Sequence, residues 1–505
     1  MSSVTEYLNY IDGKYTGGDS VEFTDVINPA NSRTVFKVAK GTEADVDRAV
    51  QSAKQTLESG VWSGKTPEER ANVLMNAAML IFLNKDKLAN LESVTSGGTI
   101  RRTSTVDIAI TAATFYMTAL TLKELPRVEH AMCPPWIVPV HSYWKREPVG
   151  VCAGITPWNY PMILAAWKIA PALAMGNSIV VKPASTTPVT TLEMAGLLRM
   201  AGLPAGVFNV VCGPGGAVGE RLVTHPDVDK VAFTGSTEVG RRIARLASDS
   251  IKRVTLELGG KSPLIILDDA DMDLAVNVSL FAFLLNSGQV CESGTRLFVP
   301  RHRQQELAER MVEKIKKLTI GDQLDMATDL GPIANAMQLD TIVNYVETAQ
   351  KEGAELFYGG QRLTGGDYGR GFFFTPTIFI NCRNDMTIAR EEIFGPVQCV
   401  IPYDDVDEAV AMANETIYGL GAGICGKNVA ETQKLAARLR AGTVWINTWH
   451  MLRPDAPFGG YKQSGLGREN CYHALLNYSE VKHICQDLTP GADDKFFNPL
   501  IGLNK

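Results

Sequence analysis

Residues 150–257 alternate between short β-rich runs and helical or glycine-rich segments, and this alternation constrains the fold more than any other feature. The β-rich runs are GVCAGI (150–155), SIVVK (178–182), VFNVV (207–211), VDKVAF (228–233) and RVTLE (253–257). Such a repeat is typical of a doubly wound parallel sheet with helices on both faces. Because ligands of these sheets bind at the carboxyl ends of the strands, we expect functional residues there.

The segments on either side of this repeat extend the prediction. Before it, residues 42–57 have the spacing of an amphipathic helix that Thr42 can cap. After it, a second strand–helix region runs from Pro263 to about residue 460, and the stretch around VPVHSYW near Trp144 has the character of an extended ribbon. The residues after Pro490 are expected to form a loose tail. We therefore predict an α/β fold with two doubly wound parallel-sheet domains and a small β ribbon.

Composition excludes several classes of function. The formal net charge is −6, and no basic run suggests nucleic acid or a membrane surface. We find no signal peptide and no run of about eighteen apolar residues that would span a membrane. The nine cysteines are scattered and form no CxxC pair, which favours a reducing compartment such as the cytoplasm over a disulfide framework. No motif predicts a metal site.

Four stretches contain residues that are hard to explain structurally. Alone, each has an ordinary reading: a packed cysteine, a solvated glutamate or a turn-forming asparagine. Together they supply a thiol nucleophile, a carboxylate base and a side-chain amide donor, which is what acyl chemistry requires. The stretches are Thr156-Pro157-Trp158-Asn159-Tyr160-Pro161, Glu257-Leu258-Gly259-Gly260-Lys261, Gly288-Gln289-Val290-Cys291 and Glu391-Glu392-Ile393-Phe394-Gly395-Pro396.

The chain resembles the aldehyde dehydrogenase superfamily along essentially its whole length. The resemblance runs from Asn28-Pro29-Ala30 to PFGGYKQSG (457–465), and it includes two specific markers in order, LELGGKSP and GQVCESGTR. It implies NAD(P)-dependent oxidation of an aldehyde to a carboxylic acid. It also implies a Rossmann-type dinucleotide-binding domain (1–127 and 148–258), a catalytic domain (259–470), and an oligomerisation segment and tail (128–147 and 471–505).

The resemblance also assigns the catalytic groups. Cys291 is similar to the family's nucleophile, which forms a thiohemiacetal and then a thioester. Free cysteine has a pKa of ~8.5, so we expect the site to favour the thiolate. Glu257 resembles the general base, and Asn159 resembles the oxyanion donor together with the backbone N–H of Cys291. Glu469 matches a glutamate proposed for proton relay, with a surface ion pair as the alternative. Lys168 matches a lysine near the active centre, with structural support as the alternative.

For the cofactor, the usual G-x-G-x-x-G is absent, and Phe233 to Gly240 instead follows a strand and opens a helix, whose N-terminus suits a phosphate. The alternative is a structural turn. Many NAD-preferring relatives carry glutamate where this chain has Ser185, and serine removes the repulsion of a 2′-phosphate, so we expect NADP to be accepted, alone or beside NAD. The residues that the resemblance implies for cofactor binding are Ile155, Thr156, Pro157, Trp158, Lys182, Ser185, Gly215, Gly219, Phe233, Gly235, Ser236, Val239, Leu258, Gly259, Glu392 and Phe394.

The positions that match the family's substrate pocket are mostly apolar or aromatic, which suits an aliphatic, aromatic or terpenoid aldehyde. An aromatic cage for betaine aldehyde is the second reading, although leucine stands at position 285 where those enzymes usually have tryptophan. Glu292 either favours a cationic amino-aldehyde or points away, and Arg453 either binds a carboxylate or is solvated. The pocket positions are Tyr160, Leu164, Trp167, Leu285, Val290, Glu292, Trp449, His450, Leu452 and Phe458.

Three other classes remain as alternatives. An acylating relative would pass the thioester to coenzyme A, but it would often lack the base that Glu257 matches. A non-catalytic crystallin-like protein would tend to lose the nucleophile or the base. A thioesterase would not need a dinucleotide domain. The family assembles as dimers or tetramers by strand exchange, so we also expect a homo-oligomer, with the ribbon near 128–147 and the segment near 475–490 as the exchanging pieces.

Overall fold

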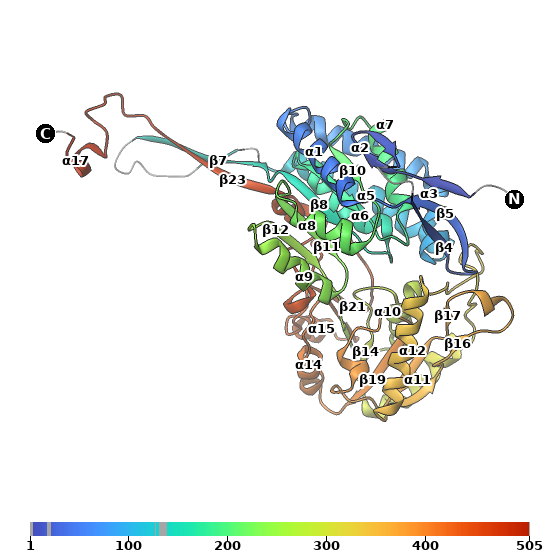
Figure 1. Ribbon diagram of the computed structural model, residues 1–505. Coiled ribbons are helices and arrows are strands. Elements are labelled where there is room, and N and C mark those ends of the chain that lie inside the picture. Colours follow the sequence, from blue (N-terminus) through green and yellow to red (C-terminus); the bar gives the residue numbers. More distant parts are fainter. Residues whose placement is uncertain (1–3, 18–21, 127, 131–138, 504–505) are drawn as a thin grey trace.

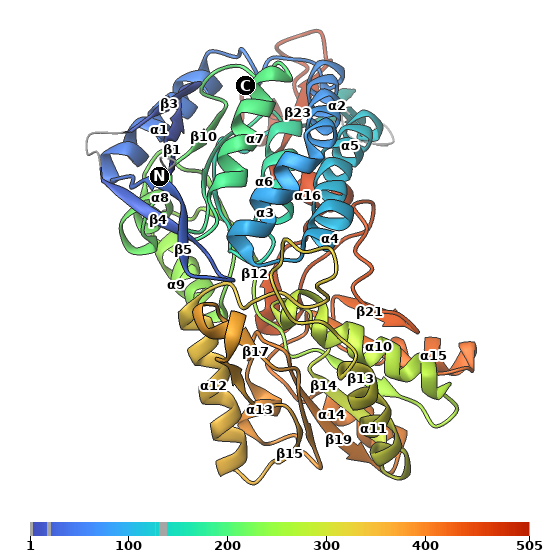
Figure 2. The same ribbon diagram turned by 90° about the vertical axis from the view of Figure 1, so that its right-hand side faces the viewer.

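The computed structural model describes residues 4–17, 22–126, 128–130 and 139–503. Within these residues, two large sheets organise the chain into an N-terminal and a C-terminal lobe (Figures 1 and 2). A narrow strand pair leaves the N-terminal lobe and extends far from the body.

The first sheet has eight strands, and its five central strands are parallel. All five β-rich runs predicted between 150 and 257 form these strands. The chain moves outward from β8 through β9 to β10 and then returns to the other side of β8 for β11 and β12, which is the Rossmann order with its topological switch point between β8 and β11. The order is β22 (Gly465–Leu466), β12 (Arg253–Glu257), β11 (Lys230–Thr234), β8 (Val151–Ile155), β9 (Ser178–Lys182), β10 (Phe208–Val210), β2 (Asn9–Ile11) and β3 (Lys14–Thr16).

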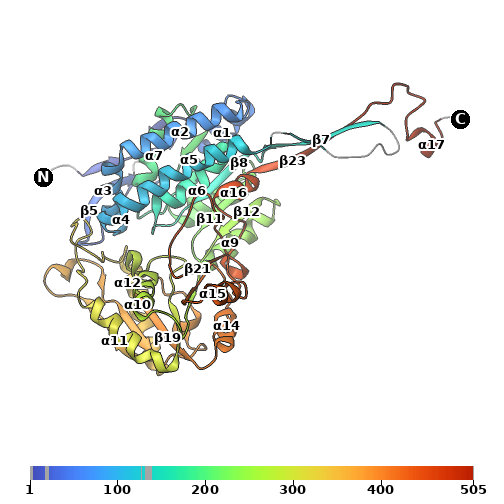
Figure 3. The same ribbon diagram turned by 180° about the vertical axis from the view of Figure 1, so that it is seen from behind.

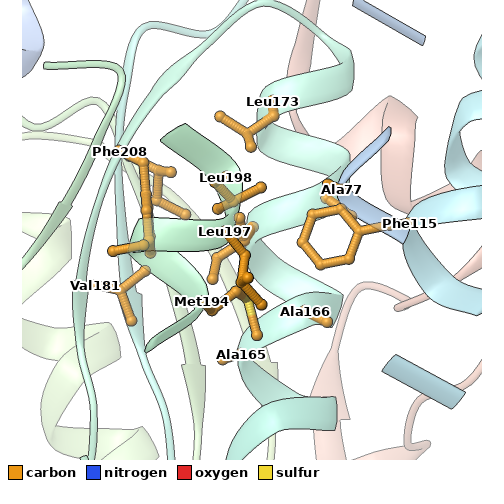
Figure 4. Packing of buried hydrophobic residues seen from close by; sticks show 14 of the residues in the cluster. Ala77, Phe115, Ala165, Ala166, Leu173, Val181, Met194, Leu197, Leu198 and Phe208 are labelled. Carbon is orange, nitrogen blue, oxygen red and sulfur yellow. The ribbon is translucent and has the colours of Figure 1, made fainter. Parts of the chain in front are cut away.

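Alternate residues of these strands bury against helices on opposite faces. In β8, Val151 and Ala153 pack with one helix group and Cys152 packs with the other. The first group is α1 (Glu43–Glu58), α8 (Glu220–Thr224) and α9 (Thr237–Ser248); the second is α2 (Pro67–Leu83), α3 (Lys85–Ser96), α5 (Ile108–Glu124), α6 (Pro161–Ala174) and α7 (Val189–Met200). Figure 4 shows part of the second group, where Phe115 of α5 lies beside Ala77 of α2 and next to α6.

Helix α1 confirms the prediction for residues 42–57. Thr42 accepts a hydrogen bond from the backbone N–H of Asp45, and the Asp45 carboxylate accepts one from the backbone N–H of Thr42, which completes a capping box. The buried face consists of the expected small and branched residues Val46, Ala49, Val50 and Ala53.

One helical run, Ile100–Glu124, is long and apolar enough to cross a membrane by length and composition alone. Its main part, α5, packs against α2 and α6. Ile108, Phe115 and Ala119 are fully buried in the same cluster. These contacts are those of a core helix.

The second sheet has seven strands, six of them parallel, and it confirms the second strand–helix region. Its order is β15 (Glu355–Tyr358), β18 (Thr377–Ile380), β19 (Val397–Tyr403), β14 (Arg296–Pro300), β13 (Pro263–Ile266), β20 (Gly421–Cys425) and β21 (Thr443–Ile446). The helices over its two faces are α10 (Met272–Leu284) and α11 (Gln304–Ile315) on one, and α12 (Ala336–Lys351), α13 (Thr387–Arg390), α14 (Val406–Asn414) and α15 (Val429–Ala436) on the other.

The predicted ribbon forms a projecting arm (Figures 1 and 3). In it, β7 (Val140–Pro148) pairs antiparallel with β23 (Ser479–Asp487) and with the short β6 (Val128–His130). Residues 131–138, which include Cys133, lie outside the described residues. The expected loose tail contains one short helix, α17 (Asn498–Ile501), near the end of the arm. A further three-stranded sheet joins β1 (Thr5–Tyr7), β5 (Arg33–Ala39) and β4 (Phe23–Asn28). The domain boundaries remain a prediction. One strand of the range predicted as catalytic, β22, pairs with β12 of the first sheet.

Candidate active site

A cavity of about 250 Å³ lies where the carboxyl ends of β8, β11 and β12 face the loop between α10 and β14. This is beside the switch point of the first sheet, where ligands of such folds bind. The cavity brings together residues from all four stretches that the sequence singled out. Its lining is Pro157, Trp158, Asn159, Leu164, Thr234, Gly235, Ser236, Glu257, Leu258, Gly259, Cys291, Gln338, Thr341, Glu392, Ile393 and Phe394.

Cys291 sits in the loop before β14, and its Sγ donates a hydrogen bond to Oε2 of Glu292 at 3.1 Å. Burial raises the pKa of the Cys291 thiol well above its usual value, and the carboxylates of Glu292, Glu392 and Glu257 raise it further. The expectation that the site favours the thiolate is therefore wrong for this arrangement. Burial and three acidic neighbours all favour the protonated thiol.

The loop that carries Cys291 is held in a strained shape. Asn286 and Ser287 adopt left-handed backbone angles (φ 54° and 53°), and Gly288 follows at φ 74°. A Cβ on Gly288 would lie 2.2 Å from the carbonyl oxygen of Gly395, so only glycine fits there. Strain of this kind is common beside functional groups.

Asn159 is buried next to this loop, and two hydrogen bonds join them. The Asn159 side-chain amide donates to the carbonyl of Gln289 at 3.0 Å, and the Asn286 amide donates to the carbonyl of Asn159 at 3.1 Å. The Asn159 amide is thereby fixed near the thiol, and its second N–H is available to another acceptor.

Glu257 ends β12 and is buried. Burial raises the pKa of Glu257 well above its usual value, the charge of Glu469 raises it further, and Lys168 and Arg468 oppose the shift. Within the described part of the chain, its Oε2 has no hydrogen-bond partner. A buried carboxyl group with one free oxygen is suited to exchange a proton with a ligand or water.

Glu392 and Phe394 also line the cavity. The backbone N–H of Gly260 donates to Oε1 of Glu392 at 3.1 Å, and burial raises the pKa of Glu392 to about 7. The rings of Phe394 and Trp158 meet edge to face at 5.3 Å, with Phe394 in a left-handed conformation (φ 58°). Gln338 holds this segment through bonds from its side-chain amide to the carbonyls at 393 and 394.

A sequence profile of the aldehyde dehydrogenase family matches residues 15–484. The chain belongs to the aldehyde dehydrogenase family. It is similar to solved structures of betaine aldehyde dehydrogenase from Staphylococcus aureus. One, in complex with NAD+, is 38% identical with a TM-score of 0.94 and covers 96% of each chain. Another, an apo point mutant with a BME-modified cysteine, is 38% identical with a TM-score of 0.94, and the match covers 97% of each chain.

This aldehyde dehydrogenase places further predicted cofactor residues at or after the carboxyl ends of β8, β9, β10 and β11. The backbone N–H of Thr156 donates to the carbonyl of Lys182. The aliphatic part of the Lys182 side chain packs near Gly219, where an added Cβ would lie 3.5 Å from it. The Ser185 hydroxyl donates to the carbonyl of Gly213 at 3.0 Å. Ile155 and Phe233 are buried in these strands, and Gly215 lies in the turn that contains Gly219. None of these residues is among those that line the cavity, so their part in cofactor binding stays a prediction.

At the β11–α9 turn, the Ser236 hydroxyl accepts the backbone N–H of Val239 and caps α9. A Cβ on Gly235 would lie 2.5 Å from the Phe233 ring. The turn therefore has the structural role that the sequence left open as an alternative. Its glycine also lines the cavity, and the cofactor-binding reading of the turn stays a prediction.

Lys168 and Glu469 form a buried ion pair with an N–O distance of 2.8 Å, and Lys168 also donates to the hydroxyl of Thr234 at 2.7 Å. Their side chains are 0% and 4% exposed. Glu469 is therefore not in a surface ion pair, the alternative considered from the sequence. The pair connects α6 to the loop that precedes α16 (Cys471–Asn477).

We expect Glu469→Ala to lower the free energy of unfolding by about 3–5 kcal/mol, because it leaves the Lys168 charge buried without its partner. Urea unfolding followed by circular dichroism measures the change. A matched control is Glu480→Ala, which removes one side of the exposed Arg253–Glu480 pair and should cost under about 1 kcal/mol. Equal losses in the two variants would contradict this description of the pair.

Five of the ten predicted pocket residues belong to one apolar cluster with Cys291. Leu164, Trp167 and Phe458 form a small buried cluster, and Tyr160 and Leu452 pack against it together with the cysteine. The rings of Trp167 and Phe458 lie 5.2 Å apart. Three further members, which the sequence did not single out, are Ile110, Ile163 and Leu420.

The other predicted pocket residues are placed differently. Trp449 lies in the core of the second sheet, where its ring fills the space above Gly294 and Gly423 and its N–H donates to the backbone carbonyl of Glu292. Leu285 lines a neighbouring cavity with Phe281 and Arg102. Val290 is buried.

Glu292 does not point away from the site. It is 2% exposed and contacts both Cys291 and His450.

Within the described residues, no group of three or more His, Cys, Asp or Glu side chains could hold a metal ion.

Proposed function

We propose that this aldehyde dehydrogenase oxidises aldehydes to carboxylic acids with NAD or NADP through a covalent bond between Cys291 and the substrate. The observation that carries the proposal is the convergence of Cys291, Asn159, Glu257 and Glu392 on one cavity beside the switch point of the first sheet. The relatives of known structure bind NAD+.

The cavity suits a dinucleotide on several counts. The buried Thr156 hydroxyl has no hydrogen-bond partner among the described residues. Position 259 is glycine, and a Cβ there would collide with the Glu392 carboxylate. In this proposal Lys182 and Glu392 hold the two riboses, and Phe394 packs beside the nicotinamide. When bound, the nicotinamide accepts hydride from the substrate carbon.

The side chains of this chain divide the remaining work. Cys291 Sγ adds to the aldehyde carbonyl, and the Asn159 amide and the backbone N–H of Cys291 donate to the oxygen as it becomes negative. After hydride has left, Glu257 removes a proton from the water that attacks the thioester. The Lys168–Glu469 pair beside Glu257 then relays that proton or supports the site.

The substrate that best suits the cluster around Cys291 is an aliphatic, aromatic or terpenoid aldehyde, because Leu164, Trp167, Phe458 and Leu452 give an apolar wall. Arg453 supplies no support for a carboxylate substrate, since it is exposed and pairs with Asp455 through two hydrogen bonds.

A second candidate is a betaine aldehyde or amino-aldehyde. The buried carboxylate of Glu292 next to the thiol favours a cation, and the similar structures are betaine aldehyde dehydrogenases. The aromatic side of the site is less favourable, because the Arg102 guanidinium already lies 4.3 Å above the Tyr160 ring.

An aldehyde panel with NAD and NADP in parallel, followed by absorbance of the reduced cofactor, tests both candidates. We expect apolar aldehydes to have the higher kcat/KM, acid to form without coenzyme A, and both cofactors to be used. Ser185→Glu should lower kcat/KM with NADP at least about tenfold and preserve NAD use, because a carboxylate repels the 2′-phosphate. Turnover that requires coenzyme A would contradict hydrolysis of the thioester by water. A complete failure to use NADP would contradict the expectation drawn from Ser185.

The same proposal includes a homo-oligomer, dimer or tetramer, in the cytoplasm. In the projecting sheet, β23 is an edge strand and offers an edge for exchange between copies. The eight described cysteines are free, which suits a reducing compartment.

A further inference from the structure

The Glu292 carboxylate joins the reactive thiol to a histidine. Its Oε2 accepts the hydrogen bond from Cys291 Sγ at 3.1 Å, and its Oε1 lies 3.0 Å from Nδ1 of His450. The side chains of Glu292 and His450 are 3% and 2% exposed. Of the carboxylates near the cysteine, Glu292 is the one for which the described structure gives a hydrogen bond to Sγ.

Two acidic groups near the thiol differ in charge state. Burial alone would raise the pKa of Glu292, but its bond with His450, the charge of His450 and the bond from Cys291 outweigh burial, and the pKa is lowered. The pKa of Glu257 is raised well above its usual value by burial. The lowered pKa therefore favours the ionised Glu292 carboxylate, which has a free lone pair to accept a proton, whereas the raised pKa of Glu257 favours its protonated form.

The groups that face Cys291 come from several elements. Glu257 reaches it from β12, Glu392 from the loop after α13 and Glu292 from its own loop, and all three disfavour the thiolate. Tyr160, at the start of α6, also lies within electrostatic range of the thiol. A thiolate does not form easily in advance here, so a base in contact with the thiol is needed when it attacks.

We propose that Glu292 accepts the proton of the Cys291 thiol as sulfur adds to the aldehyde carbon, and that His450 positions the Glu292 carboxylate for this step. In the addition, the S–C bond forms, the C=O π pair moves to oxygen and the S–H proton moves to Oε2 of Glu292. Nothing is oxidised in this step. When the thioester is hydrolysed, the departing sulfur takes the proton back from Glu292. The inference rests on the proposed function and separates two proton acceptors: Glu292 for the thiol and Glu257 for water.

The test is Glu292→Gln, which keeps the shape of the side chain and removes its basicity. The matched control is Asp268→Asn, which alters an exposed carboxylate–histidine pair with His302 at 2.9 Å. Two pH profiles are measured for each protein: kcat/KM for an aldehyde, and the rate of Cys291 alkylation by iodoacetamide without aldehyde.

For Glu292→Gln we expect kcat/KM at pH 7 to fall about 100-fold and to recover as the pH rises toward the pKa of the thiol. The alkylation profile should stay in place or move to lower pH, because an anion next to sulfur has been removed. A kcat/KM profile that moves to higher pH while the alkylation profile does not is the signature of a lost base. If Glu292 only opposed thiolate formation, both profiles would move to lower pH and kcat/KM at pH 7 would rise, which would overturn the proposal.

A second variant keeps the test decisive if Glu292→Gln folds poorly. His450→Phe removes the hydrogen-bond partner of Glu292 Oε1, so the Glu292 carboxylate should become less well placed. The pH at which kcat/KM falls on the acid side should therefore shift. An unchanged limb would contradict the positioning role. A different result would contradict the proposed function, namely aldehyde oxidation that survives the loss of the Cys291 thiol. The alkylation rate needs no turnover, so it tests the thiol independently of that function.

Discussion

Cys291→Ala should lower kcat for aldehyde oxidation by about 10⁴-fold or more, because the covalent route through a thioester is lost with the sulfur. The small apolar side chain fits the packed cluster around position 291, so the fold and the cofactor cavity should persist. The measurements are steady-state turnover and binding of NAD by fluorescence.

The control for this prediction is Cys485→Ser, because Cys485 is exposed on β23, far along the chain from the cavity. That variant should retain full turnover. If Cys291→Ala kept more than about 1% of wild-type kcat while binding NAD normally, sulfur at this position would not be the nucleophile.

Glu257→Gln should uncouple the first turnover from the later ones. With Glu292 acting on the thiol, reduced cofactor should still appear in a burst equal to the number of active sites, and the steady rate should then fall about 10²–10⁴-fold because the thioester is hydrolysed slowly. Stopped-flow absorbance separates the two phases. A variant that loses the burst as well would show that Glu257 acts before the thioester forms.

The pH dependence of the wild type carries the same information. Glu257 must be deprotonated to take a proton from water, and burial raises its pKa, so the hydrolytic rate should fall as the pH drops through that raised value. This acid limb should disappear from the slow phase of Glu257→Gln. Glu480→Gln, which changes an exposed carboxylate on β23, should leave the limb unchanged.

The parts of the fold that depend on local pattern could be predicted from the sequence. The strands around the switch point appear as short β-rich runs, and Thr42 with Asp45 marks the start of α1. The four stretches with functional residues could also be chosen, because their residue types are unusual at strand ends and in loops. Two of them, after β8 and β12, meet because the carboxyl ends of parallel strands lie at one edge of the sheet. The other two, with Cys291 and Glu392, precede strands of the second sheet, and only the packing of the two lobes brings them to the same cavity.

The parts that depend on long-range contacts could not be predicted. Lys168 and Glu469 are far apart in the chain, and nothing local shows that they form a buried pair. Gln338 looks like any polar residue of an amphipathic helix until its amide is seen to hold the segment around Phe394. Trp449 was expected at the pocket, but an aromatic residue near a site packs equally well into the core, and here it does.

The direction of Glu292 was left open by the sequence for a related reason. Adjacent side chains in a loop have no fixed relation, so only the folded structure brings its carboxylate to both Cys291 and His450. The expectation that Cys291 is a thiolate was wrong because it started from the pKa of free cysteine. Burial and the three acidic neighbours, which raise that pKa, cannot be seen in the sequence.

The most direct test is to mix Glu257→Gln with an aldehyde and NAD, quench with acid during the slow phase, digest the protein and analyse the peptides by mass spectrometry. We expect the peptide with Cys291 to gain the mass of one acyl group, and the gain to be absent without NAD. An acyl group on another residue, or carboxylic acid formed while Cys291 stays unmodified, would contradict this expectation.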